Sequence, residues 1–339
     1  MLDIESLDAL IEYLRASGRI KPTEQPRASI MQGGVSNRTV LLERESGEAW
    51  VIKQALEKLR VKADWFADVK RIEREATALK TLGRMLPGGS TPVFVFEDRD
   101  IHLLAMTAIP QPHENWKTML LSGNVQLTHA GQFATLLAQL HRASWMKLDE
   151  LNDLEDRSFF ESLRIEPYYL YSAQHQPDAV TFINFLIAAT RTRRFSLVHG
   201  DYSPKNVLVH LDKLVLLDFE VMHFGDPAFD LGFSLAHFLS KAHHLPAHRH
   251  AFADAAMHFA KTYLRSLGMQ SDAAEIDRFG AQHALACLLA RVAGRSPLEY
   301  LTADEQRRQC HVVLDLMKAT PASMVELIDT FLDGVTRCP

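Results

Sequence analysis

The stretch His199–Asn206 reads HGDYSPKN, and it is followed by the apolar run VLV and then by LVLLDFE at Leu214–Glu220. Asp201 and Asn206 are 5 positions apart, and Asp218 lies 12 positions beyond Asn206. The apolar run VLV follows Asn206, and the apolar run LVLL precedes Asp218. These runs predict two short strands joined by a tight loop. Carboxylate and amide oxygens are the ligands that Mg²⁺ prefers in proteins. The spacing therefore predicts Asn206 and Asp218 as metal ligands at one rigid edge.

Asp201 has a different predicted role. In phosphoryl transfer, a carboxylate orients the acceptor hydroxyl and takes its proton late in the reaction. The catalytic loop of kinases, H-R-D-L-x-x-x-N, has the same Asp-to-Asn spacing, and a second metal-binding Asp follows it. Asp and Asn are also common turn residues, so a purely structural loop is the alternative. The full string, with its second acidic cluster, favours Asp201 as the catalytic residue.

Three segments together resemble the aminoglycoside phosphotransferase and choline kinase superfamily: HGDYSPKN, LLDFE, and GDPAFDLG at Gly225–Gly232. Gly200 stands where protein kinases carry Arg, and no Ala-Pro-Glu motif follows the metal loop, so the small-molecule branch is favoured. The resemblance runs over nearly the whole chain. It implies a kinase that uses ATP and Mg²⁺ to phosphorylate a hydroxyl of a small molecule, with Ser203 as a further nucleotide-binding candidate. It also implies that Asp230 caps a helix or binds the backbone of the catalytic loop.

Short β-like runs dominate the sequence before residue 110, and the helical period dominates after it. This change predicts an α+β, bilobal protein-kinase-like fold. We expect a small β-rich N-lobe over residues 1–107 and a large, mainly helical C-lobe over residues 108–339. Strands are predicted at Arg27–Met31, Thr39–Glu43, Ala49–Lys53, Val93–Phe96 and His102–Met106, with one helix at Phe66–Leu86. Helices are predicted at Thr128–Ser144, Asp178–Arg191, Asp230–Ser240, Ala247–Leu267, Ala273–Val292 and Pro321–Leu332, interrupted by a short β-rich insert at Val198–Phe219.

A glycine-rich turn between the first two predicted strands is a candidate phosphate-binding loop. It reads QGGVSNR, in which Gly33 and Gly34 let the backbone approach a ligand and Ser36 and Asn37 offer further donors. A Gly-Gly turn can equally be an ordinary hairpin.

Lys53 ends the third predicted strand, where kinases place the lysine that binds the α- and β-phosphates. An ordinary strand-end lysine is the alternative. Glu75, on the predicted helix, is its expected partner, and Glu73 is the competing candidate.

The link between the two lobes is predicted to hold the adenine ring. Its backbone N–H and C=O groups, contributed by Met106, Thr107, Ala108 and Ile109, would face the base, with apolar side chains above and below.

A narrower resemblance is to methylthioribose kinases. It rests on IKQALEKLRVKADWF at Ile52–Phe66, on RIEREATAL at Arg71–Leu79, and on LLARVAGRSPLEYL at Leu288–Leu301. That family has an Asp-x-Glu in which both acids hold metal, which implies Glu220 as a further ligand. An adjacent pair of arginines contacts the substrate there. In this chain Arg291 matches one arginine of the pair, and Ala290 replaces the other. Methylthioribose kinases also differ from this chain at the position of Asn206, where they do not carry Asn.

The bulk composition of the 339 residues is that of an average globular protein, with 47% hydrophobic and 23% charged residues and a net charge of −5. Nothing in it indicates a nucleic-acid partner, and no apolar run is long enough for a membrane span. The 3 cysteines and an acidic N-terminal segment, which is expected to form an amphipathic helix, favour a cytoplasmic protein. We expect a monomer or homodimer whose partner is a small hydroxylated acceptor.

Two further interpretations stay open. A nucleotide-binding pseudokinase would act as a sensor or scaffold, but such proteins typically lose the base or a metal ligand. An aminoglycoside antibiotic kinase would often line its acceptor site with acids, and the late helices show no acidic cluster. A run of five histidines from His237 to His250 is interpreted as a solvated helix–loop segment and not as a metal site.

Overall fold

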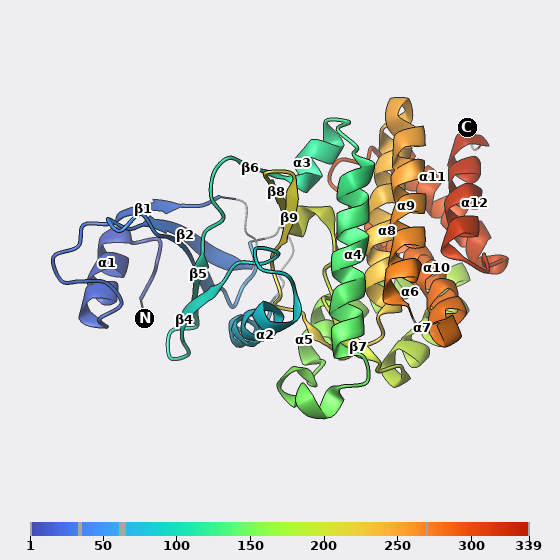
Figure 1. Ribbon diagram of the computed structural model, residues 1–339. Helices are drawn as coiled ribbons and strands as arrows, with labels where there is room; N and C mark the ends of the chain where they lie inside the picture. The colour runs from blue at the N-terminus through green and yellow to red at the C-terminus, as the bar shows by residue number, and fades with distance from the viewer. Residues whose placement is uncertain (1, 33–35, 61–65, 269, 338–339) are drawn as a thin grey trace.

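The computed structural model describes residues 2–32, 36–60, 66–268 and 270–337. Its N-terminal part is an antiparallel five-stranded sheet in the order β1-β2-β3-β5-β4, seen on the left of Figure 1. The strands are β1 (Arg27–Ile30), β2 (Asn37–Glu43), β3 (Ala49–Ala55), β4 (Phe94–Asp98) and β5 (Leu103–Thr107). All five predicted strands are therefore confirmed, with ends that differ by one or two residues.

Two helices cover this sheet. The N-terminal amphipathic helix is confirmed as α1 (Leu7–Ala16), which buries Leu10 and Leu14 in a small core with the sheet. The second is α2 (Arg71–Met85), which begins five residues later than predicted. The preceding segment forms a β-bridge between Lys58 and Phe66 instead of a first helical turn.

The rest of the chain is mainly helical (Figure 1). Its helices are α3 (Trp116–Leu121), α4 (Leu127–Ser144), α5 (Ser158–Phe160), the π-helix η3 (Glu161–Leu170), α6 (Tyr171–His175), α7 (Val180–Thr192), α8 (Ala228–His244), α9 (Arg249–Leu267), α10 (Gln270–Ala293), α11 (Ala303–Lys318) and α12 (Met324–Arg337). The six predicted helices are confirmed, whereas α3, α5, η3, α6 and α11 were not predicted. The β-rich insert is confirmed as strands β7 (Ser196–Val198), β8 (Val207–His210), β9 (Lys213–Leu216) and β10 (His223–Gly225), and β6 (His113–Asn115) pairs with β8.

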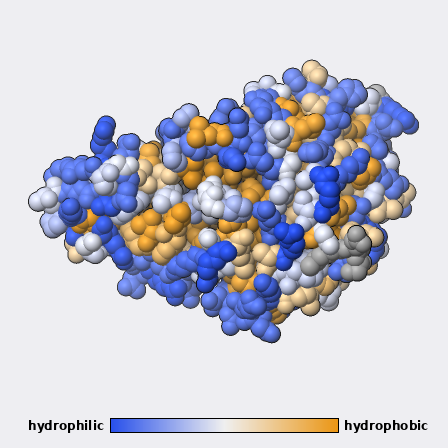
Figure 2. Space-filling model, viewed as in Figure 1, coloured by the Kyte–Doolittle hydropathy of each residue, from blue (hydrophilic) through white to orange (hydrophobic). Residues whose placement is uncertain are grey.

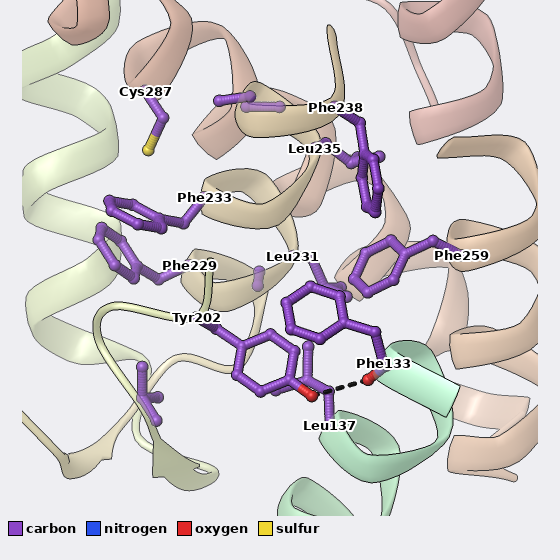
Figure 3. Packing of buried hydrophobic residues seen from close by; sticks show 14 of the residues in the cluster. Phe133, Leu137, Tyr202, Phe229, Leu231, Phe233, Leu235, Phe238, Phe259 and Cys287 are labelled. Atoms are coloured by element: carbon purple, nitrogen blue, oxygen red, sulfur yellow. Dashed lines mark hydrogen bonds between the residues drawn. The ribbon is translucent and has the colours of Figure 1, made fainter. Parts of the chain in front are cut away.

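Helix α8 lies at the centre of the helical part, because its sequence is apolar on nearly every face. It is buried from Ala228 to His243 and packs against α9 and α10. Figure 3 shows its aromatic side chains meeting those of α4 and α9 in one core. The same core holds Tyr202 of the catalytic loop, whose ring stacks on Phe133 with centroids 4.0 Å apart. The loop is thus fixed to the rigid core by the residue next to Asp201.

On the face drawn in Figure 2, apolar side chains gather along the middle and hydrophilic ones surround them. Among the described residues, no helix is both long enough and apolar enough to cross a bilayer.

Candidate active site

The structure brings the predicted catalytic loop and the predicted metal loop together. A single turn of 3₁₀-helix, η5 (Pro204–Asn206), follows Asp201 and leads into β8. The Asn206 amide Nδ2 donates to the Asp201 carboxylate Oδ2 at 2.8 Å and to its carbonyl oxygen at 3.0 Å. The hairpin of β8 and β9 then delivers Asp218, which adopts a left-handed backbone with φ of 68°. This sparsely populated conformation at a charged residue is typical of a functional site.

Asp230 holds the backbone of the catalytic loop. One carboxylate oxygen accepts from the N–H of His199 at 2.7 Å and the other from the N–H of Gly200 at 2.9 Å. The residue before the first turn of α8 is Pro227, so Asp230 binds the loop backbone and does not cap the helix. Gly200 has a φ of +76°, and a Cβ there would lie 2.9 Å from Val221. This position therefore excludes the larger residue that protein kinases carry.

We expect Asp230→Ala to lower the free energy of unfolding by about 2–4 kcal/mol, because it leaves two buried N–H groups without an acceptor. Chemical denaturation of the variant measures the loss. Asp254→Ala on the exposed side of α9 is the matched control and should stay within about 0.5 kcal/mol of the wild type. An unchanged midpoint for Asp230→Ala would remove its anchoring role.

His199 links the two loops. Its Nδ1 accepts from the N–H of Asp201 at 3.2 Å, and its Nε2 donates to the carbonyl oxygen of Leu217 at 3.2 Å. Burial lowers the pKa of His199, which keeps the ring neutral and able to accept and donate at the same time. The neutral ring therefore couples the position of Asp201 to that of the neighbouring Asp218.

Two cations that the sequence analysis missed flank Asp201. Lys205 Nζ lies 2.8 Å and Arg164 Nη2 lies 3.1 Å from the same carboxylate oxygen. Burial by itself would raise the pKa of Asp201, but Arg164 and Lys205 outweigh burial and hold that pKa well below its usual range. Lys205 could have been noticed at four positions after Asp201, whereas Arg164 comes from η3, a segment without a recognisable motif.

On the opposite side of the cleft, Lys53 pairs with Glu75. Lys53 Nζ lies 2.7 Å from Glu75 Oε1 and 3.4 Å from Asp218 Oδ1. The Glu75 side chain is fully buried, whereas the competing Glu73 is a quarter exposed and lies 3.8 Å from Arg99. Burial lowers the pKa of Lys53, but the charges of Glu75 and Asp218 outweigh burial and raise it, so the amine is charged.

Arg71 is a third residue that the sequence analysis missed. It lies one helical turn before Glu75 and is fully buried, with Nε 3.1 Å from Glu220 Oε2. Its Nη2 donates to the carbonyl oxygens of Leu56 and Ser36, and its Nη1 donates to those of Ala67 and Asp68. Arg71 therefore ties the start of β2 to Glu220. The signal that could have revealed it is the spacing of four between Arg71 and Glu75 in RIEREATAL.

A cavity of about 470 Å³ lies beside the link between the sheet and the helices. Its walls include all four predicted adenine-binding residues, together with Val51, Leu208 and Leu217. The N–H groups of Thr107 and Ala108 already donate to carbonyl oxygens of Val93 and Ala49, at 2.9 and 2.8 Å. These two N–H groups are therefore not free to bind a base.

Filling this cavity should exclude a nucleotide. We expect Val51→Trp to weaken Mg·ATP binding about tenfold or more, because Val51 lies on a cavity wall, opposite Met106 in the sheet. Calorimetric titration measures the affinity. Val93→Trp is the control, since Val93 is 63% exposed. Equal affinities for the two variants would place the nucleotide elsewhere.

A second cavity of about 510 Å³ adjoins the first and shares Thr39, Lys53, Leu217 and Asp218 with it. Asp201, Asn206 and Glu220 also face this second cavity, which we call the acceptor cavity. Arg291, at the end of α10, lies in its far wall.

The oxygen atoms at the junction of the cavities fit a hard divalent cation. Asp218 and Glu220 supply carboxylates, and Asn206 uses its Nδ2 on Asp201, which leaves its amide oxygen for a metal. Burial, reinforced by Asp218, raises the pKa of Glu220 to about 7. Within the described residues, no group of three or more His, Cys, Asp and Glu side chains can hold a metal alone. This donor set suits Mg²⁺, which is usually held by one or two carboxylates together with substrate phosphates.

The remaining predicted site residues differ in their position relative to the two cavities. Ser36 and Asn37 face the acceptor cavity, whereas Gly33 and Gly34 lie outside the described residues. Ser203 is buried, its hydroxyl has no hydrogen-bond partner among the described residues, and it faces neither cavity.

The interpretation of the histidine run as solvated is wrong for two of its members. His237 and His243 are buried, because they lie on α8, which other helices enclose. His237 faces the acceptor cavity, and burial lowers its pKa well below the usual value.

The sheet, the helical part and the two joined cavities between them define a bilobal protein-kinase-like fold. A family model described as the phosphotransferase enzyme family matches residues 28–275. Because the match covers more than half of the 339 residues, the chain belongs to this family.

Two curated relatives are methylthioribose kinases, as the narrower resemblance predicted. That of Yersinia enterocolitica is 27% identical over 261 residues, which are 68% of this chain and 64% of that protein. That of Citrobacter koseri is 25% identical over 266 residues, which are 70% of this chain and 66% of that protein. The match thus spans slightly less than two thirds of the relatives' length.

Solved structures share the fold at lower identity. The amicoumacin kinase hAmiN in complex with AMP-PNP, Ca²⁺ and Ami has a TM-score of 0.57 and 14% identity, over 92% of this chain and 94% of that one. The gentamicin-APH(2")-IIa complex has a TM-score of 0.52 and 15% identity, over 96% of this chain and 99% of that one. These likenesses confirm the predicted fold class.

Proposed function

We propose that the protein is an ATP-dependent, Mg²⁺-requiring kinase that transfers the γ-phosphoryl group to a hydroxyl of a small molecule. One observation carries the proposal. The two cavities meet at Lys53 and Asp218, and Asp201 faces the acceptor side of that junction. A phosphoryl group at the junction would lie between a nucleotide on one side and an acceptor on the other.

The roles of the residues follow from their positions. Lys53, held by Glu75, would bind the phosphates of the nucleotide, and the link at Met106–Ile109 would hold its base. Asn206, Asp218 and Glu220 would hold Mg²⁺, which neutralises phosphate charge when bound. Asp201 would orient the acceptor hydroxyl. Because its pKa is low, it is a weak base and takes the proton only after the new O–P bond has largely formed.

The relatives and the charges of the cavity indicate the class of acceptor. Methylthioribose kinase relatives support a sugar or polyol. An aminoglycoside antibiotic kinase is less well supported, because four cations, Lys117, Arg164, Lys205 and Arg291, surround the acceptor side and only Asp201 and Glu299 oppose them, which disfavours a polycation. A pseudokinase is also less well supported, since Lys53, Asp201, Asn206 and Asp218 are all present.

We also keep the proposal of an N-lobe over residues 1–107, a C-lobe over residues 108–339, and a cytoplasmic location. Cys287 and Cys310, the cysteines in the described part of the chain, are both free thiols. This state suits a reducing compartment.

A screen of hydroxylated metabolites for acceptor-dependent release of ADP tests the function. We expect at least one acceptor to raise ADP release well above the rate with water, and EDTA to abolish this increase. Tight Mg·ATP binding without turnover on any acceptor would favour the pseudokinase.

A further inference from the structure

The far wall of the acceptor cavity carries two cations, Lys117 and Arg291, and one carboxylate, Glu299. It is formed by Lys117 of α3, Tyr168 of η3, His237 of α8, Arg291 of α10 and Glu299 of the segment after α10. These elements come from distant parts of the sequence, so the wall exists only in the folded chain.

Arg291 is the centre of this wall and is only 5% exposed. Its Nη1 donates to the carbonyl oxygen of Ser296 at 3.1 Å, and its Nη2 donates to His237 Nε2 at 3.2 Å. The guanidinium also lies over the rings of Tyr168 and Phe233, with its carbon 4.8 and 5.2 Å from their centroids. Within the described ranges, no carboxylate lies within ion-pair distance of Arg291. A buried guanidinium without an anion is costly, because hydrogen bonds to neutral groups and ring contacts replace only part of the charge stabilisation that water supplied.

A second buried cation lies behind the first. Lys241 is fully buried one helical turn after His237, and its Nζ donates to the His237 carbonyl oxygen at 3.4 Å. No carboxylate of the described part of the chain pairs with it. Burial, together with the charges of Lys117 and Arg291, lowers the pKa of Lys241 to about 7. The positive charges of the wall therefore add to the cost of burying this ammonium.

The other cations that face the cavity each contact a carboxylate. Arg164 and Lys205 both contact Asp201. Lys117 forms an ion pair with Glu299, and Lys53 pairs with Glu75. Among the described residues, Arg291 is thus the cation that faces the cavity without a carboxylate in contact. An anion brought by a ligand would supply the missing partner, and a guanidinium can bind a carboxylate or a phosphate through two parallel hydrogen bonds.

We propose that Arg291, with Lys117 at the rim, forms a subsite for an anionic group of the acceptor, a carboxylate or a phosphate that the acceptor carries in addition to its reacting hydroxyl. This inference rests on the proposed function for the position of the hydroxyl at Asp201. The acceptor would then be a hydroxy acid, a sugar acid or a phosphorylated sugar instead of a neutral polyol. The competing explanation is that Arg291 serves only to hold the Ser296 segment against Tyr168.

Sulfate is a suitable probe, because it mimics both anions and cannot be phosphorylated. It is titrated calorimetrically into the full-length protein saturated with Mg·AMP-PNP, so that the nucleotide site is filled. We expect saturable binding by the wild type, at least tenfold weaker binding by Arg291→Gln, and an intermediate affinity for Arg291→Lys. Arg278→Gln, an exposed arginine on the same helix, is the matched control and should bind as the wild type does.

Thermal melting checks that Arg291→Gln is folded. If it is not, Lys117→Gln decides instead, since Lys117 is partly exposed and its loss also frees the negative charge of Glu299. We expect that variant to bind sulfate several times more weakly. The subsite would be overturned if a folded Arg291→Gln bound sulfate with wild-type affinity. If Arg291→Gln is unfolded, wild-type affinity in Lys117→Gln would overturn it. The absence of saturable sulfate binding by the wild type would also overturn it.

Matched acceptor pairs then separate the two anions and test the function independently. Glycerate is compared with glycerol, gluconate with sorbitol, and ribose 5-phosphate with ribose, by acceptor-dependent release of ADP. The anionic member of at least one pair should have a kcat/KM about 100-fold higher, and Arg291→Gln should raise its KM while leaving the KM for ATP unchanged. A preference for the neutral members would overturn the anionic acceptor. Failure of Mg·AMP-PNP to bind at all would count against the proposed function, and sulfate binding to the nucleotide-free protein would then decide the subsite.

Discussion

Asp201→Asn is expected to lower kcat by about 10²–10⁴-fold while leaving the affinity for Mg·ATP nearly unchanged. The substitution keeps the size of the side chain but removes the charge that orients an acceptor hydroxyl and takes its proton. In the folded protein this charge is held by Arg164 and Lys205. An amide would leave both cations unbalanced beside the reacting oxygen, so part of the loss comes from repositioned neighbours.

Single-turnover phosphorylation of the best acceptor from the screen measures the effect, and Mg·ATP titration measures the binding. Asp212→Asn is the matched control. Asp212 lies in the turn of the β8–β9 hairpin with a φ of 58°, which Asn also adopts readily, and its side chain is 91% exposed. Wild-type turnover by Asp201→Asn would refute the assignment of the catalytic loop.

The sequence predicted the loops of the candidate site more completely than its surroundings. Asp201, Asn206 and Asp218 lie in one continuous segment, so their spacing was visible, and the apolar runs between them indicated the strands. Arg164 and Arg71 reach the same site from η3 and α2. Such contacts depend on how distant elements pack, and no local pattern records that packing.

The elements of the fold were also predicted best where the local sequence pattern was strong. Helix α8 was recognised from its period, but not as a buried helix, so His237 was interpreted as solvated. Helix α11 was missed although Thr302 and Glu305 form a capping box at its start, a signal that the sequence does contain. The π-helix η3 has Pro167 inside it, and a proline in a helix interior removes a backbone donor, so this segment carries no clear helical signal.

The charge on Asp218 is expected to decide whether the nucleotide binds as its magnesium complex. Asp218→Ala should weaken Mg·ATP binding by about two orders of magnitude or more, because a carboxylate ligand for the metal is lost. Alanine also disfavours the φ of 68° at this position, so some of its effect would come from the backbone. Asp218→Asn separates the two causes, since Asn keeps the shape and tolerates this conformation while removing the charge.

Affinity for ATP in EDTA supplies the second half of this experiment. Without metal, the Asp218 carboxylate faces the phosphates directly and repels them, and Lys53 is shared between Asp218 and Glu75. Asp218→Asn should therefore bind metal-free ATP at least as tightly as the wild type, while Mg·ATP binds far more weakly. A purely structural Asp218 would weaken both forms of the nucleotide equally. Unchanged Mg·ATP affinity in Asp218→Asn would refute its role as a metal ligand and would leave Glu220 and Asn206 as the remaining candidates.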